Sequence, residues 1–160
     1  MNQLLLAIIL SILPITELRA GLPVAVDYAL KNNISIIPIF FLIILVNIAV
    51  IFLVFFFLDF FHKWFLKINI YKRVFGYFVE RTRKKAESVK EKMSVYGFLA
   101  LAIFVAIPLP ATGAWTGCLI AWLLGLDRKK SIAAIGLGVI VAGIIILIAS
   151  LGVFGLIGLF

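Results

Sequence analysis

Three charged side chains interrupt an apolar part of the chain, and their types suggest proton and anion chemistry. Glu17 and Arg19 break the first apolar stretch, and Asp27 follows in the second half of that stretch. An ionisable group at the centre of a membrane helix costs roughly 2.5–3.5 kcal/mol, so it usually has a functional partner. A carboxylate in such a place can exchange a proton, and an arginine can bind an anionic headgroup. We therefore predict coupling carboxylates at Glu17 and Asp27 and an anion-binding group at Arg19.

A second interpretation of Glu17 and Arg19 stays open. Both residues would then lie close enough to the outer interface to be hydrated, and their ion pair would only fix a turn of the chain. The two interpretations differ in whether the carboxylate takes part in a transport cycle.

A second break, at residues 108–117, contains two prolines, two threonines and two glycines. A helix that begins after the prolines would direct free backbone N–H groups and the positive end of its dipole at a phosphate or carboxylate. Thr112 and Thr116 would add hydroxyl groups, and Trp115 would either close the cavity or simply pack. Together the two breaks predict substrate-binding residues at Arg19, Gly21, Pro23, Pro108, Pro110, Thr112, Gly113, Trp115 and Thr116.

Neither enzymatic chemistry nor nucleic-acid binding is indicated. The sequence has no nucleophile elbow, phosphate loop or metal-ligand constellation, and Cys118 is the single cysteine. We expect no catalytic residues, no metal and no cofactor, and hence no enzyme. Ten of the fifteen basic residues lie between Lys63 and Lys92, but bulky apolar residues interleave with them, which argues against a nucleic-acid surface.

The elements that must position these residues are membrane helices. Apolar residues make up 65% of the chain and charged residues 14%, whereas a soluble chain has about 45–50% and roughly 25%. Residues 34–58 and 131–160 are uncharged and exceed the roughly 20 residues that span a bilayer. We expect one transmembrane domain with these two stretches as full crossings.

The two broken stretches, residues 4–30 and 94–126, are either re-entrant hairpins or kinked crossings. If both are hairpins, the basic segment 63–92 and the bases at 128–130 fall on one side, as the positive-inside rule requires. If the second were a full crossing, the bases at 128–130 would lie outside. We therefore favour hairpins in a multi-pass protein of the cell membrane with its basic connector in the cytoplasm.

The order of hairpin and crossing occurs twice, which suggests a duplication. An offset of 96 residues places Pro14 on Pro110, Gly21 on Gly117, Leu30 on Leu126 and Ser35 on Ser131. Each half crosses the membrane an odd number of times, so the second copy must be inverted, as in many secondary transporters. The predicted fold is all-α, with repeats at residues 1–58 and 94–160 joined by a basic amphipathic connector at 59–93.

The connector is expected to form an interfacial helix. Its apolar residues recur at a spacing of three and four and would lie in the acyl boundary, with the interleaved bases near anionic headgroups. These apolar residues are Phe61, Trp64, Phe65, Ile68, Tyr71, Phe75 and Phe78.

With the motifs at residues 16–23 and 108–117, the chain resembles the small multidrug-export membrane protein family over nearly its whole length. That family in turn looks like a distant branch of the DedA and VTT superfamily, whose members have two facing re-entrant hairpins and are implicated in moving phospholipids or polyprenyl phosphates. The resemblance implies that Glu17 and Asp27 match the acidic residues of proton coupling. The chain departs from the DedA pattern after its second hairpin, where arginines are expected and none occurs until Arg128.

These observations predict a secondary transporter, coupled to protons or sodium, that moves an amphiphile such as a phospholipid or a polyprenyl phosphate. The alternatives are a drug/proton antiporter and a non-transporting membrane scaffold or biogenesis factor. The expected partners are membrane lipids and a second copy of the chain, because a homodimer would cover hairpin tips that otherwise face lipid.

Overall fold

A computed structural model describes residues 2–65, 90–109 and 112–157, and these are helical without strands. The helices are α1 (Gln3–Ile12), α2 (Glu17–Lys31), α3 (Ile36–Phe65), α5 (Lys90–Ala106), α6 (Ala114–Leu123) and α7 (Arg128–Ile157). The predicted all-helical class is confirmed. The predicted interfacial helix of the connector falls mostly outside the described residues.

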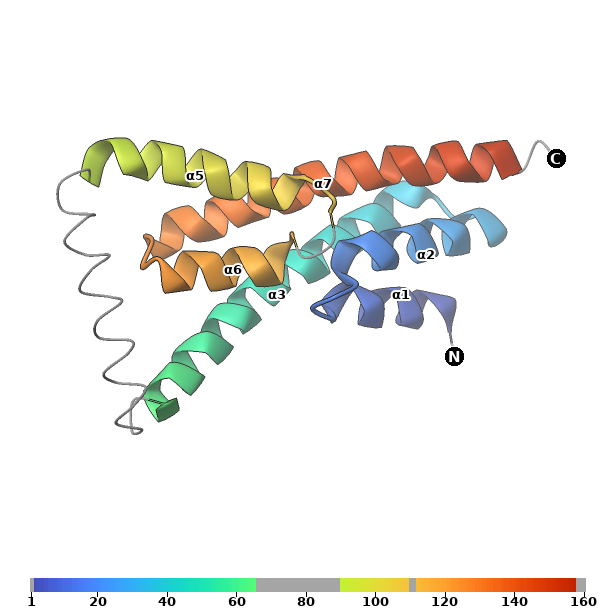
Figure 1. Cartoon of the computed structure of the whole chain (residues 1–160). Helices are drawn as coiled ribbons and strands as arrows, with labels where there is room; N and C mark the ends of the chain where they lie inside the picture. The colour runs from blue at the N-terminus through green and yellow to red at the C-terminus, as the bar shows by residue number, and fades with distance from the viewer. Residues whose placement is uncertain (1, 66–89, 110–111, 158–160) are drawn as a thin grey trace.

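Two short antiparallel helix pairs lie against two long helices (Figure 1). α1 and α2 form one pair, followed in the chain by α3, and α5 and α6 form the other, followed by α7. The α1–α2 turn and the α5–α6 link approach each other near the middle of the molecule, while the outer ends of the two pairs point in opposite directions (Figure 1). This arrangement brings both predicted breaks to one place.

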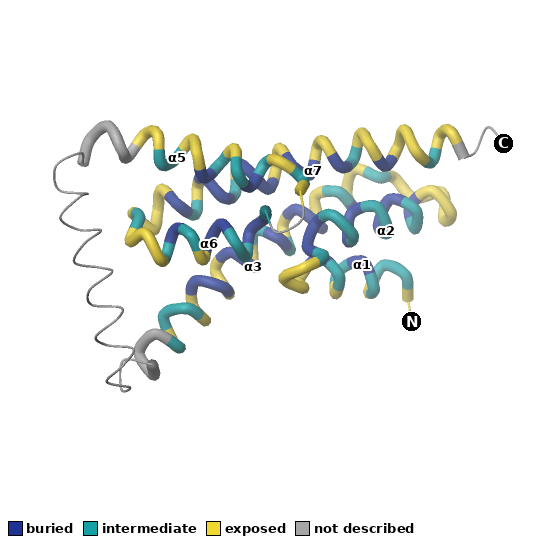
Figure 2. The backbone as a smooth tube through the Cα atoms, viewed as in Figure 1, coloured by how far each residue is buried: buried dark blue, intermediate teal, exposed yellow. Residues whose placement is uncertain are grey.

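The two long helices are the candidate membrane spans, over Ile36–Phe61 and Arg128–Leu156. They fit the two crossings predicted from the apolar stretches. Their inward faces form part of the buried core, whereas their outer faces are exposed (Figure 2). The bulky exposed residues of α3 include Phe41, Leu45 and Phe56. An apolar exterior of this kind suits contact with lipid rather than water.

The first break is shorter than the sequence predicts, because α2 begins at Glu17 and continues through Pro23. A proline inside a helix removes one backbone hydrogen bond, here the one to the carbonyl of Arg19, and need not end the helix. The chain instead turns at residues 13–16, and Glu17 completes the turn with a left-handed backbone (φ 45°). The second break occupies residues 107–113, so Trp115 and Thr116 belong to α6.

Two glycines related by the 96-residue offset occupy comparable positions in the two pairs. A Cβ on Gly21 of α2 would overlap Ser11 of α1, and a Cβ on Gly117 of α6 would lie 2.8 Å from Val105 of α5. Each glycine therefore lets the two arms of its own pair approach closely, which is consistent with duplication.

Candidate functional site

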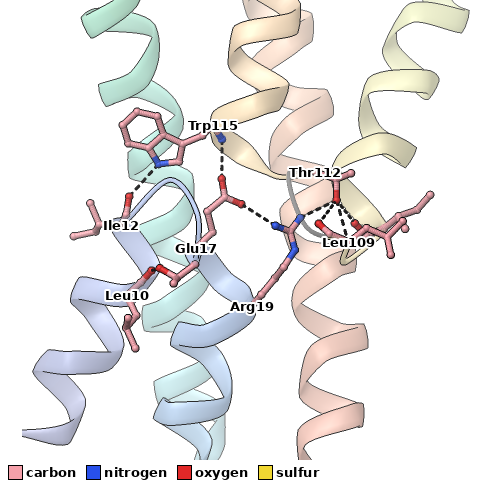
Figure 3. A network of polar contacts seen from close by, with 9 residues as sticks. Leu10, Ile12, Glu17, Arg19, Leu109, Thr112 and Trp115 are labelled. Atoms are coloured by element: carbon pink, nitrogen blue, oxygen red, sulfur yellow. Dashed lines mark hydrogen bonds and ion pairs between the residues drawn. The ribbon is translucent and has the colours of Figure 1, made fainter.

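Glu17 joins the two helix pairs at the centre of the molecule. Its side chain is buried, and its Oε1 accepts a hydrogen bond of 3.0 Å from the backbone N–H of Trp115 (Figure 3). Trp115 lies in the first turn of α6, where N–H groups have no partner within the helix. Gly113, the residue before α6, has no side chain to cap them, so the carboxylate of Glu17 takes that role from another helix.

Gly113 makes the approach of this carboxylate possible. A Cβ at position 113 would overlap the carboxylate of Glu17. The 96-residue offset predicted from the sequence places Glu17 on Gly113, so this contact would join equivalent positions of the predicted repeat.

Arg19 lies beside Glu17 and contacts the second pair as well. Its Nη1 is 3.9 Å from Oε2 of Glu17, and its Nη2 donates a hydrogen bond of 2.8 Å to Oγ1 of Thr112 (Figure 3). Its Nε is buried and has no hydrogen-bond partner among the described residues. The guanidinium therefore balances the charge of Glu17 and connects α2 to the segment between α5 and α6.

Two threonines fix the backbone on either side of this centre. Thr16 Oγ1 donates to the carbonyl of Leu10 at 2.7 Å, and Thr112 Oγ1 lies 2.6 Å from the carbonyl of Ile107, which it can likewise donate to. Both carbonyls lie at or just beyond the end of the preceding helix, where such groups lack helical partners. Sequence reasoning missed Thr16, although a proline, a threonine two residues later and a glycine five residues after that occur in both breaks.

The side chain of Trp115 adds a third hydrogen bond between the two pairs. Its indole Nε1 donates a hydrogen bond of 3.0 Å to the carbonyl of Ile12, at the end of α1 (Figure 3). Trp115 thus binds the α1–α2 turn through its side chain and Glu17 through its backbone. The sequence predicted that Trp115 either closes the cavity or packs. The structure adds a hydrogen bond from its side chain to these two possibilities.

Asp27, the second predicted coupling carboxylate, lies away from this centre. It is ten residues further along α2, about 15 Å at the helical rise. It accepts hydrogen bonds from Lys31 at 2.7 Å and from Gln3 at 2.6 Å. The bond from Lys31 is the main cause that lowers the pKa of Asp27 below its ordinary value, with a smaller contribution from Gln3, while partial desolvation opposes both.

The other predicted substrate-binding residues are distributed unevenly. Gly21 is buried between α1 and α2, and Pro23 is half-buried further along α2. Thr116 and Pro108 are half-buried near the second break, and Pro110 lies outside the described residues. The structure thus brings together Glu17, Arg19, Thr112, Gly113 and Trp115.

Comparison with known proteins gives a family match over residues 17–145, from Glu17 into α7. No curated protein and no solved structure matches the chain. The family match does not extend to the DedA and VTT superfamily, so that wider relation stays a prediction. Because the match covers most of the chain, the protein belongs to the family described as putative small multi-drug export proteins.

Proposed function

We propose that the protein is a proton-coupled secondary transporter of amphiphilic molecules in which Glu17 is the coupling group. The observation that carries this proposal is a buried carboxylate that bonds α2 to the first turn of α6, where the two helix pairs meet. The family match supports membrane transport in general, and the coupling ion and the substrate are part of the proposal.

The coupling rests on the charge of Glu17. When ionised, the carboxylate interacts favourably with the N-terminus of α6 and with Arg19. Protonation removes the charge, weakens both interactions and allows the two pairs to separate. The first N–H groups of α6 and the Arg19 guanidinium then become available to an anionic headgroup, such as that of a phospholipid or polyprenyl phosphate. Proton binding and substrate binding therefore favour each other.

The proposed membrane arrangement follows from the two pairs. α3 and α7 cross the bilayer, while α1–α2 and α5–α6 enter from opposite faces and turn back near the midplane. The end of α3 and the start of α7 lie at the same end of the molecule, and Arg128, Lys129 and Lys130 are found there (Figure 1). This end would be cytoplasmic by the positive-inside rule. The two halves then form the inverted repeats of a multi-pass cell-membrane protein.

A second candidate function is drug export by exchange with protons. The family match favours it, because the family's description names multi-drug export. It uses the same coupling carboxylate and differs in the charge of the substrate that it predicts.

Flux through purified protein in liposomes tests the proposal. Phospholipid, polyprenyl phosphate and drug probes would be followed under an imposed pH gradient, with a sodium gradient as the comparison. We expect accumulation driven by the pH gradient in the parent protein and none in Glu17→Gln. Glu91→Gln, at the opposite end of α5 from the site, is the matched control and should transport like the parent. Equal accumulation by Glu17→Gln and the parent would show that Glu17 only fixes the turn.

A further inference from the structure

Four side chains from three helices meet at the basic end of the molecule, well away from Glu17. Phe55 and Asp59 are four residues apart on α3 and so lie on one face of it. Trp122 comes from α6 and Arg128 is the first residue of α7. We call these four residues the α3–α7 corner.

The corner holds a cation between an aromatic ring and a carboxylate. The guanidinium carbon of Arg128 lies 4.7 Å from the centre of the Phe55 ring, and Arg128 Nη1 donates to Oδ2 of Asp59. A ring face and a carboxylate are both attractive to positive charge. Trp122 Nε1 donates to the other oxygen of Asp59 at 3.1 Å and orients the carboxylate.

A cavity of about 170 Å³ lies next to this cation and is open to the outside. Among the described residues that line it, Arg128 is the one that carries a charge, and the others are apolar or aromatic. The lining residues are Phe55, Ala121, Trp122, Gly125, Leu126 and Arg128. The cavity can therefore accept an apolar group attached to whatever cation occupies the corner.

Arg128 is held less firmly than Asp59. Asp59 accepts hydrogen bonds from two different helices, whereas Arg128 stands at the N-terminus of α7, where the helix dipole disfavours positive charge. The side chains of Arg128 and Asp59 are 46% and 41% exposed, and ion pairs as exposed as this one are weak. Displacing the arginine is thus easier than displacing the carboxylate, which makes the corner more accessible to a foreign cation than to an anion.

We propose that the α3–α7 corner is a binding site for lipophilic organic cations, and that Arg128 occupies it as an internal competitor. The ligand's positive centre takes the place of the guanidinium between Phe55 and Asp59, and its apolar group fills the adjacent cavity. This inference rests on the second candidate function, drug export, for its purpose, since it names organic cations as the substrate class, but binding itself requires no transport.

The test is the affinity of the full-length protein in nanodiscs for benzyltrimethylammonium, with the ¹⁵N-indole resonance of Trp122 as a local readout. Neopentylbenzene, a neutral probe of the same shape, and benzylphosphonate, an anion, are the comparison ligands. We expect saturable binding of the cation alone. Arg128→Gln should tighten it about tenfold, because an exposed ion pair and a cation–π contact no longer compete. Asp59→Asn should weaken it by at least about tenfold.

Lys129→Gln is the matched control, because it removes one positive charge from the same turn of α7 without removing the competitor. It should leave the affinity close to that of the parent. If Asp59→Asn does not give monodisperse protein, Phe55→Leu replaces it and should weaken binding about fivefold. The proposal is overturned if Arg128→Gln weakens cation binding or tightens it no more than Lys129→Gln. Binding of benzylphosphonate that is lost in Arg128→Gln would likewise overturn it and identify an anion site. None of these binding results depends on whether Glu17 couples transport.

Discussion

At the scale of single residues, Glu17 combines an unusual backbone with a long-range contact. A left-handed conformation costs an ordinary L-residue roughly 1–2 kcal/mol, and Glu17 adopts one at φ 45°. The conformation starts α2 directly at the turn and directs the carboxylate to α6. The hydrogen bond to Trp115 and the proximity of Arg19 offset the cost. Strain of this kind is characteristic of functional positions.

The close approach of Glu17 to Gly113 gives a stability prediction. Gly113→Ala should destabilise the protein by about 1–3 kcal/mol, because the new Cβ would displace the buried carboxylate of Glu17 from the backbone N–H of Trp115. Glu17→Ala removes that carboxylate, so the double variant should be more stable than the sum of the single changes predicts. Unfolding by denaturant in mild detergent measures both effects.

Gly97→Ala serves as the control for this prediction. Gly97 lies within α5, and a Cβ there meets no atom of the described residues within 4 Å. Alanine should be neutral or slightly stabilising at that position. If Gly113→Ala proves as stable as Gly97→Ala, the hydrogen bond between Trp115 and the carboxylate of Glu17 does not contribute to stability.

Asp27 gives a prediction about pH. Its folded-state pKa is lowered, chiefly by the hydrogen bond from Lys31, so its contribution to stability is present above the ordinary value of 3.8 and is lost as the pH falls through the folded value. Asp27 should stay charged at neutral pH. Asp27→Asn should therefore leave the pH profile of transport unchanged near neutrality, and Lys31→Gln should raise the pKa of Asp27 in an NMR titration. A transport profile that shifts in Asp27→Asn would make Asp27 a coupling group after all.

At the scale of helices, the apolar stretches predicted the two long elements well, because length and absence of charge are local properties of the sequence. The predicted extent of the first break was wrong. Tertiary packing supports α2, so Pro23 costs one hydrogen bond without ending the helix. The bond between Glu17 and Trp115 could not be predicted, because it joins residues 98 positions apart and depends on how closely the two turns approach. The sequence did indicate Glu17, Arg19, Thr112, Gly113 and Trp115, since polar or helix-breaking residues in apolar helices are unusual.

The continuity of α2 predicts the effect of replacing its proline. Pro23→Ala supplies the missing N–H in a helix interior and should leave stability unchanged or raise it by up to about 3 kcal/mol. Thermal unfolding in detergent, followed by helical circular dichroism, is the measurement. A loss of stability would indicate that Pro23 shapes a break, as the sequence first suggested.

At the scale of the whole molecule, the arrangement of the two pairs predicts a topology. Asn32, at the end of α2, and Lys129, in the first turn of α7, should lie on opposite faces of the membrane (Figure 1). The buried Cys118 would first be replaced by alanine. A single cysteine introduced at position 32 or at position 129 is then the one thiol available for labelling. Impermeant thiol reagents added to intact or inverted vesicles should modify the two sites from opposite sides. Modification of both from the same side would exclude the proposed pair of hairpins.

The proposed mechanism requires that a substrate moves together with, or in exchange for, a proton carried by Glu17. The test uses liposomes that contain the purified protein and a trapped pH-sensitive dye. The dye signal is recorded when substrate is added outside the liposomes without an imposed pH gradient. We predict a substrate-dependent pH change with the parent protein and with Glu91→Gln, and none with Glu17→Gln, while Glu17→Gln still binds the substrate. A pH change of the same size with Glu17→Gln would show that Glu17 does not carry the proton.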